Sequence, residues 1–210
     1  MTRSNDDNFM IQEILPAIRR ALHMEDAILQ TKLRDSKHAE FYSPENANIQ
    51  GISYSLLTER AFQYVIVREL CTDYKLLYED GAYADSPKQR LDLSIYRDEA
   101  DIDQYAEIGI EIKYVLFTKK GTLKAGNRFN GLVKDFEKIK KAGNKSKYLL
   151  LLGVHEKDTV PLGSIEEQLG EKVSSTNHAP HRLADECFAT VGDTSENFFH
   201  IVLMKVRPTR

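Results

Sequence analysis

The chain has few of the features that mark secreted or membrane proteins. Only two of its 210 residues are cysteine, Cys71 and Cys187, and no CxxC spacing occurs. A disulfide-stabilised scaffold is therefore not expected, and a reducing cytoplasm is the expected location. No apolar run approaches the ~18 residues of a membrane span. Residues 1–8 are polar and acidic, so neither a signal peptide nor a membrane partner is expected.

Strong net charge is also absent, since the chain carries −3 with a pI of about 6.1. Overall charge thus gives no indication of a nucleic-acid partner, but its distribution does. Residues 119–147 hold ten lysines and arginines against two acidic residues, a local charge of +8 that leaves −11 for the rest of the chain. A basic segment on an otherwise acidic protein is typical of a polyanion-binding face.

Length and a hydrophobic content of 41% predict one globular domain with a substantial core. We expect residues 1–50 to form a helical extension packed on a core made by residues 51–210. Apolar residues recur at helical spacing over residues 9–37, where Pro16 marks either the first turn of a helix or a junction of two helices. A cap on the sheet is the preferred role of this extension, with a dimerisation arm or a DNA clamp as the alternative.

The remaining elements follow from hydrophobic periodicity. Helices are predicted at about 55–71, 130–142 and 164–169, and strands at 74–78, 89–96, 106–115, 148–154 and 198–206. The continuous apolar run at 148–154 is typical of a central strand buried on both faces. After the last short helix, a polar stretch carries four residues of types that can bind zinc: His178, His181, Asp185 and Cys187. Their spacing fits no familiar zinc site, so we expect them to be loop residues rather than metal ligands.

The strand at 106–115 alternates polar and apolar residues with period two. Its odd-numbered residues from Glu107 to Lys113 therefore point one way, and its three isoleucines point the other. If this strand pairs antiparallel with the strand at 89–96 across the acidic connection at 97–104, Asp92 lies beside Glu111. Two adjacent carboxylates repel each other, so the arrangement favours a divalent cation, typically Mg²⁺.

Asp92, a gap, and then Glu111-Ile112-Lys113 resembles the core motif of the PD-(D/E)XK phosphodiesterases, the restriction-endonuclease-like nucleases. The proline that precedes the aspartate in that family is Leu91 here. The resemblance covers roughly residues 55–154. It implies a mixed α/β fold with a central mixed β-sheet flanked by helices, and Mg²⁺ as cofactor with Mn²⁺ as a substitute. No small-molecule cofactor is expected.

The resemblance also implies roles for the motif residues. Asp92, Glu111 and the backbone carbonyl of Ile112 are expected to hold the metal, and Lys113 to orient the attacking water and offset charge in the transition state. Relatives carry a further metal-site glutamate on the helix before the first strand. Glu59 occupies that place, as a catalytic and metal-site residue.

Two further choices stay open. Glu69 competes with Glu59 for the role of the helix carboxylate. The basic loop and helix after the motif are predicted to contact nucleic-acid phosphates, with a solvated helix face as the alternative for the helix lysines. The residues predicted to make these contacts are Lys119, Lys120, Lys124, Arg128, Lys134, Lys138 and Lys141.

The sequence thus predicts a metal-dependent DNA endonuclease of restriction or phage-defence type. A homodimer is expected, because one compact site needs a second copy to cut both strands. Two alternatives remain: a non-catalytic nucleic-acid-binding module of the same fold, and a nuclease that acts on RNA or branched DNA.

Overall fold

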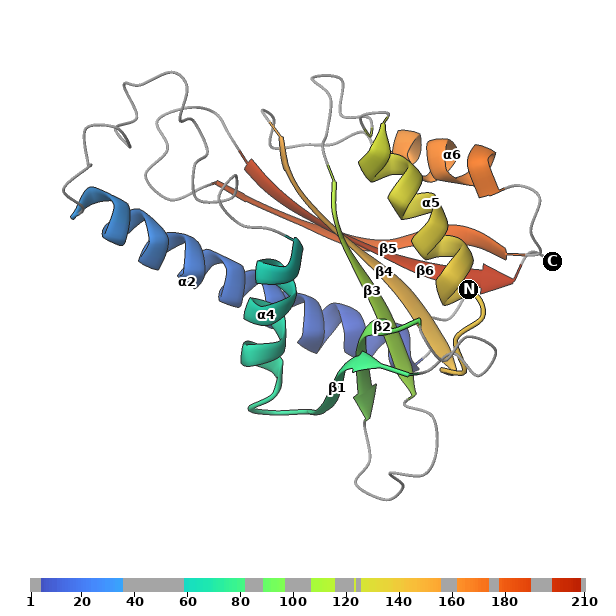
Figure 1. Ribbon diagram of the computed structural model, residues 1–210, viewed down its shortest axis with the longest axis horizontal. Coiled ribbons are helices and arrows are strands. Elements are labelled where there is room, and N and C mark those ends of the chain that lie inside the picture. The colour runs from blue at the N-terminus through green and yellow to red at the C-terminus, as the bar shows by residue number, and fades with distance from the viewer. Residues whose placement is uncertain are drawn as a thin grey trace.

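Six strands form one mixed sheet in the order β1-β2-β3-β4-β6-β5, and helices cover both of its faces (Figure 1). The computed structural model describes residues 5–35, 59–81, 89–96, 107–115, 123, 126–155, 162–173, 178–189 and 198–208. The strands are β1 (Lys75–Asp80), β2 (Leu91–Tyr96), β3 (Ile108–Tyr114), β4 (Ser146–His155), β5 (His178–Ala189) and β6 (Phe198–Pro208). The helical segments are α1 (Asn5–Phe9), the π-helix η1 (Met10–Ile14), α2 (Leu15–Arg34), α4 (Glu59–Leu70), α5 (Asn127–Ile139) and α6 (Leu162–Val173).

The first four strands follow one another in the predicted order, with a helix between the third and the fourth. β1, β2 and β3 run antiparallel in succession, whereas β3 and β4 are parallel. A parallel pair needs a crossover connection, and α5 lies in the one between β3 and β4. The predicted antiparallel pairing of the Asp92 strand with the Glu111 strand is confirmed. The acidic connection at 97–104 lies outside the described residues.

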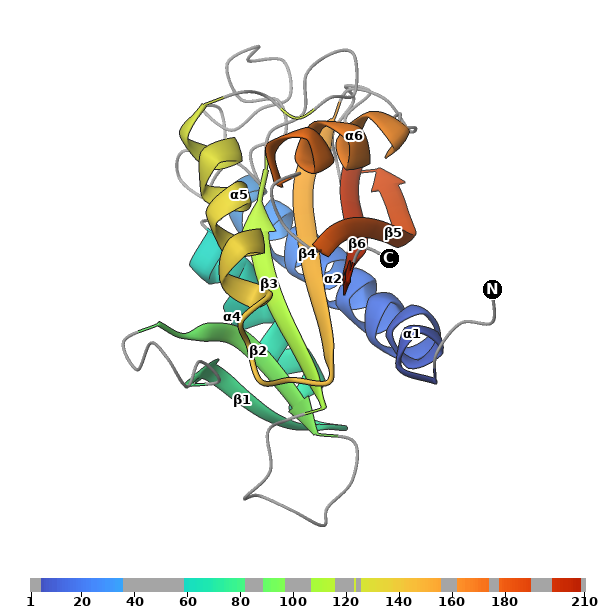
Figure 2. The ribbon, with the colours of Figure 1, turned by 90° about the vertical axis from the view of Figure 1, so that its right-hand side faces the viewer.

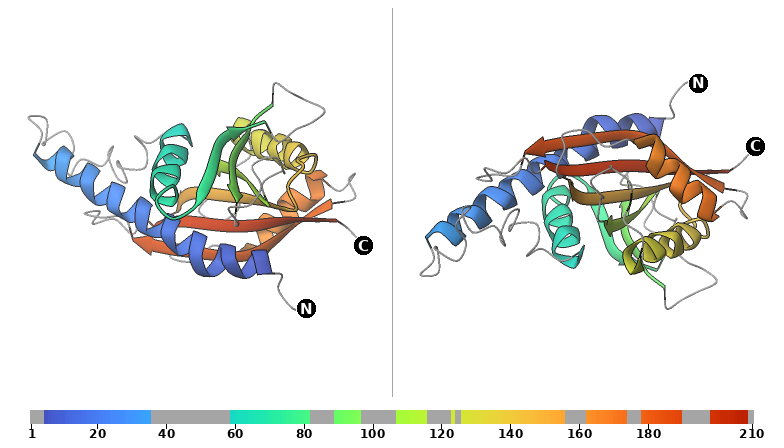
Figure 3. Two further views of the ribbon diagram at one scale, coloured as in Figure 1. Left: turned by 90° about the horizontal axis from the view of Figure 1, so that it is seen from below. Right: turned by 90° about the horizontal axis from the view of Figure 1, so that it is seen from above.

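β4 lies at the centre of the core. Tyr148, Leu150 and Leu152 pack in an apolar cluster with α2 and α4, and Leu149 and Leu151 pack in a second cluster with α5 and α6. All five are at most 1% exposed, which confirms the prediction of a strand buried on both faces. Figures 2 and 3 show α2 and α4 on one side of the sheet and α5 and α6 on the other. Burial of each leucine contributes roughly 1.5–3 kcal/mol.

Residues 5–34 follow one helical path that widens at η1. The backbone N–H of Leu15 donates to the carbonyl of Met10, five residues back, directly before Pro16. Proline lacks an N–H, and its ring clashes with the carbonyl four residues back in a regular helix, so a wider turn accommodates it. α2 begins at Leu15 directly after η1, so two helical segments meet next to Pro16, which is the second of the two predicted alternatives.

Buried ionic contacts attach α1 to the sheet. The carboxylate of Asp7 is 2% exposed and lies 2.6 Å from Lys205 Nζ and 3.3 Å from Arg207 Nη2, both on β6. The Tyr148 hydroxyl donates to the same carboxylate at 2.9 Å. Burial of Tyr148, with this hydrogen bond, raises the pKa of its phenol. Because a buried carboxylate is costly unless it is paired, these contacts fix the position of α1 on β4 and β6.

The prediction of a loop in the region of His178 was wrong. Residues His178–Ala189 form β5, which pairs with β6 along its length and lies at the edge of the sheet. An edge strand has one neighbour and keeps many polar, half-exposed side chains, and it tolerates a proline such as Pro180.

None of the helices in the described part of the chain has the length and apolarity that crossing a bilayer requires.

Candidate functional site

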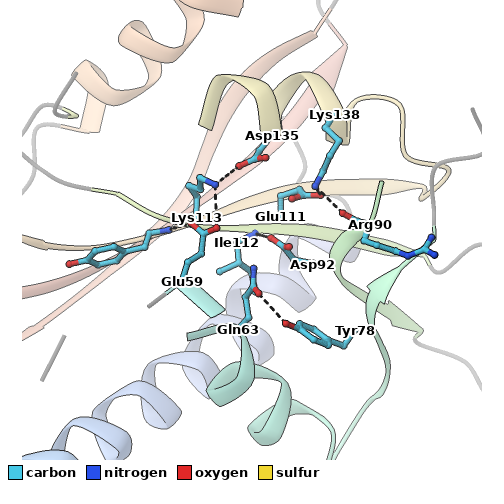
Figure 4. A network of polar contacts seen from close by, with 11 residues as sticks. Glu59, Gln63, Tyr78, Arg90, Asp92, Glu111, Ile112, Lys113, Asp135 and Lys138 are labelled. Carbon is cyan, nitrogen blue, oxygen red and sulfur yellow. Dashed lines mark hydrogen bonds and ion pairs between the residues drawn. The ribbon is translucent and has the colours of Figure 1, made fainter. Parts of the chain in front are cut away.

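Two polar side chains of β3 face α5. Glu111 forms an ion pair with Lys138 of α5 at 2.6 Å, and Lys113 forms one with Asp135 of the same helix at 2.8 Å. The isoleucines that alternate with the polar residues of β3, including Ile112, belong to the core cluster on the opposite face, with α2 and α4. The period-two pattern of the sequence therefore separates core from site as predicted (Figure 4).

Asp92 on β2 lies beside this pair. The β2–β3 register joins Leu93 to Ile110, and one further step along the strands faces Asp92 to Glu111. The Asp92 carboxylate accepts a hydrogen bond of 2.7 Å from the backbone N–H of Ile112. Because the N–H and C=O of one strand residue point toward the same neighbouring strand, the Ile112 carbonyl is directed toward the Asp92 side as well. The structure thus brings together the motif residues that the sequence predicts.

Glu59 reaches the site from the first turn of α4. Its two carboxylate oxygens accept hydrogen bonds from Lys113 Nζ at 3.2 Å and from the backbone N–H of Tyr114 at 3.1 Å. Glu69 lies in the last turn of the same helix, about 15 Å further along its axis by the rise of 1.5 Å per residue. Of the two glutamates that sequence reasoning left open, Glu59 is therefore the one at the site.

The Lys113 ammonium is held between two carboxylates. Burial works to lower the pKa of Lys113, but hydrogen bonding and attraction to Asp135 and Glu59 leave it raised. Gly131 on α5 makes room for this side chain, since a Cβ at that position would lie 3.2 Å from Lys113 Cε. A glycine inside a helix costs about 1 kcal/mol relative to alanine, so the close approach explains its presence.

The surroundings of Asp92 disfavour its charged form, whereas those of Lys113 favour its charged form. Burial raises the pKa of its carboxyl group, and the negative charges of Asp135 and Glu59 raise it further. The hydrogen bond from Ile112 and the Lys138 ammonium work against these effects without cancelling them. Burial is thus the main reason that the ionised form of Asp92 is disfavoured, and the neighbouring acids add to it.

Sequence reasoning did not find Asp135 and assigned Lys138 to another surface. Asp135 is one of the two acidic residues in the basic segment 119–147, and its carboxylate lies closer to Lys113 Nζ than that of Glu59 does. Lys138 was predicted to contact phosphates, but its ammonium lies on Glu111 and on the carbonyl of Arg90, at 2.9 Å from the latter. Gly131, an isolated glycine in an otherwise regular helix, was the available signal that α5 approaches a strand side chain closely.

The other predicted nucleic-acid contacts are placed only in part. Lys134 is exposed on α5, and Lys141 is exposed in the turn that follows the helix. The loop lysines 119, 120 and 124 and the side chain of Arg128 lie outside what the structure describes.

Among the described side chains of the site, acidic groups outnumber basic groups. Four carboxylates and two ammonium groups leave a surplus of two negative charges when all are ionised; they belong to Glu59, Asp92, Glu111 and Asp135, and to Lys113 and Lys138. Carboxylate and backbone carbonyl oxygens are the ligands that Mg²⁺ accepts, so the donor set and the charge fit a divalent cation. Among the described residues, β5 included, no three Asp, Glu, His or Cys side chains are gathered closely enough to hold a metal ion. The carboxylates of the site are instead paired with protein donors.

No family model matches this chain, and no curated protein and no solved structure matches it significantly.

Proposed function

We propose that this protein is a Mg²⁺-dependent endonuclease that hydrolyses phosphodiester bonds of DNA, with a restriction-endonuclease-like core. The observation that carries the proposal is the placement of Asp92, Glu111 and Lys113 together on adjacent strands, joined through the backbone of Ile112. The connectivity supports it as well. A helix, three antiparallel strands, a crossover helix and a parallel fourth strand follow one another from α4 to β4, as expected of that core.

Asp92, Glu111 and the Ile112 carbonyl are the groups that would hold the cation. A bound divalent ion supplies charge neutralisation at the phosphate and a nucleophilic water at neutral pH. The surplus of negative charge among the described groups of the site favours uptake of such an ion. Mn²⁺ has similar ligand preferences and serves as a substitute.

Lys113 is the residue that acts on the substrate. Its raised pKa keeps it protonated at neutral pH, so it remains a cation that orients the attacking water and offsets charge on the phosphoryl oxygens. Glu59 and Asp135 hold this ammonium at 3.2 Å and 2.8 Å, which makes both of them positioning residues. A fixed ammonium loses little freedom when the transition state forms, and this is how positioning lowers a barrier.

The substrate surface is proposed to continue along α5. Lys134 is exposed on the helix that carries both site contacts and Lys141 in the turn after it, and exposed lysines contribute affinity for phosphate without sequence specificity. One site cleaves one strand at a time, so cutting both strands calls for a second copy of the chain. A homodimer is therefore part of the proposal, and sedimentation of the protein with and without DNA tests it.

A plasmid assay tests the proposed activity. Incubation of supercoiled plasmid with Mg²⁺ is expected to give nicked and then linear DNA, and EDTA is expected to prevent both. Glu111→Gln should abolish cleavage, whereas Glu107→Gln, which removes a carboxylate paired with Lys145 just before β3, should not. Plasmid that stays supercoiled with both Mg²⁺ and Mn²⁺ would overturn the proposal for DNA. Binding without cleavage favours the non-catalytic module, and parallel reactions with RNA and branched DNA test the other alternative.

A further inference from the structure

The side chain of Lys138 is held at the site instead of extending into solvent. Its ammonium lies 2.6 Å from Glu111 Oε1 and 2.9 Å from the carbonyl of Arg90, the residue before β2. The side chains of Lys138 and Glu111 are 20% and 3% exposed. One ammonium group therefore links the start of the Asp92 strand to the Glu111 strand, and it neutralises a carboxylate that solvent hardly reaches (Figure 4).

A divalent cation on Glu111 competes with this ammonium. Metal ligands of this kind lie at about 2.0–2.1 Å from Mg²⁺, closer than the ammonium now lies to Oε1. Two cations on one poorly solvated carboxylate repel each other strongly, because the surrounding dielectric constant is low. Lysine carries its charge on a flexible four-carbon chain, so the ammonium can leave Glu111 without movement of the helix.

We propose that Lys138 is the internal counter-ion of the metal site, and that a divalent cation displaces it on binding. This inference rests on the proposed metal-dependent function and deepens it. Without metal, Lys138 neutralises Glu111 and holds it beside Asp92, so the site is assembled before the cation arrives. With metal, the ammonium is released near the exposed Lys134 of the same helix and the exposed Lys141 just after it. Loading of the cation and attraction of a polyanion are then coupled.

Titration with Mn²⁺, followed by the electron paramagnetic resonance of the free ion, measures the competition. Lys138→Met removes the competitor and is expected to tighten Mn²⁺ binding about tenfold, the effect of one charged hydrogen bond. Lys145→Met is the matched control, because Lys145 also pairs with a glutamate at β3, at 3.2 Å, but is 71% exposed. This variant changes net charge equally and should bind Mn²⁺ within about threefold of the parent protein.

Thermal unfolding gives a second readout that does not depend on cleavage. In EDTA, Lys138→Met should unfold at a lower temperature than the parent protein, because the buried carboxylate of Glu111 loses the ammonium that lies 2.6 Å away. Saturating Mn²⁺ should raise its unfolding temperature by more than that of the parent. Lys138→Gln, which keeps a donor near the Arg90 carbonyl, is expected to tighten Mn²⁺ binding in the same direction and serves if the methionine variant does not fold.

The outcomes separate this inference from the proposed function. A folded Lys138 variant that binds Mn²⁺ no more tightly than the parent protein overturns the role of Lys138 and leaves the metal site standing. Failure of parent and variant alike to bind millimolar Mn²⁺ overturns the metal-dependent function itself. Tightening in both Lys138→Met and Lys145→Met to the same extent also overturns the inference, because net charge alone then explains the effect.

Discussion

Replacing Asp135 with asparagine tests how Lys113 is held. Asp135 Oδ2 lies 2.8 Å from Lys113 Nζ, and the two side chains are 21% and 18% exposed, so solvent weakens the pair only in part. After the change Lys113 keeps Glu59 at 3.2 Å as its charged partner. The loss is therefore that of one charged hydrogen bond with partial compensation, about 1–2 kcal/mol in the free energy of unfolding. For a chain of this length that corresponds to a decrease of about 2–8 °C in Tm.

The effect of Asp135→Asn on activity should exceed its effect on affinity. An ammonium held on one side only spends less time at the attacking water, so kcat should fall on the order of tenfold while KM for DNA changes little. Single-turnover cleavage and calorimetric unfolding measure the two effects. Glu137→Gln is the control, since Glu137 pairs with Lys140 on the same helix, away from the site. An unchanged kcat in Asp135→Asn, or an equal loss in Glu137→Gln, would refute this reasoning.

Three further predictions concern the same site. Lys113→Met should lower kcat at least about a hundredfold while binding of DNA in Ca²⁺, measured by fluorescence anisotropy, stays within about threefold; equal losses in both would contradict the assigned role. Asp92→Asn should raise the free energy of unfolding at neutral pH, because the folded state raises the pKa of this carboxyl group above its ordinary 3.8 and disfavours the ionised form. The gain should shrink as the pH falls through the raised pKa toward the ordinary value, which urea unfolding at several pH values measures; a gain independent of pH would count against burial as its cause. Gly131→Ala should leave Tm unchanged or slightly higher, because alanine favours the helix, yet should lower kcat by moving Lys113, whose Cε would lie 3.2 Å from the new Cβ. Unchanged cleavage would show that Lys113 tolerates the methyl group.

Strand patterns carried most of what the sequence could predict. The alternation from Glu107 to Lys113 separated a buried isoleucine face from a polar face, and both β3 and its antiparallel partner β2 occur where expected. The continuous apolar run of β4 could only be buried on two faces. β5 escaped prediction because an edge strand with one neighbour need not alternate strictly, and the shift in its pairing with β6 between Arg182 and Ala184 breaks its period.

Helix geometry explains why sequence spacing alone does not distinguish Lys138 from Lys134 and Lys141. Successive residues rotate by about 100° around a helix, so Lys138 is turned by about 40° from Lys134, while Lys141 follows the end of α5 at Ile139. Asp135 lies a further 60° or so beyond Lys138. The first and last of these lysines stay exposed, while Lys138 lies at the boundary where the helix meets β3. A difference of this size cannot be read from spacing without knowing which face the sheet covers.

The contacts of Lys113 could not be predicted from sequence spacing for a related reason. Sequence spacing predicts which residues of one element share a face, but it does not predict how two elements cross. Glu59 and Asp135 lie 76 positions apart in the chain, on different helices, and both contact one ammonium group. Gly131 gave the nearest local signal of that crossing, because an interior glycine in a helix often marks a close approach.

The most direct test of the account is the position of Mn²⁺ in crystals of the protein, located by its anomalous scattering. The account predicts one strong peak within about 2.5 Å of carboxylate oxygens of Asp92 and Glu111 and of the Ile112 carbonyl, with the Lys138 ammonium moved away from Glu111. A peak elsewhere, or none at this site in crystals that hold Mn²⁺ at saturating concentration, would contradict it.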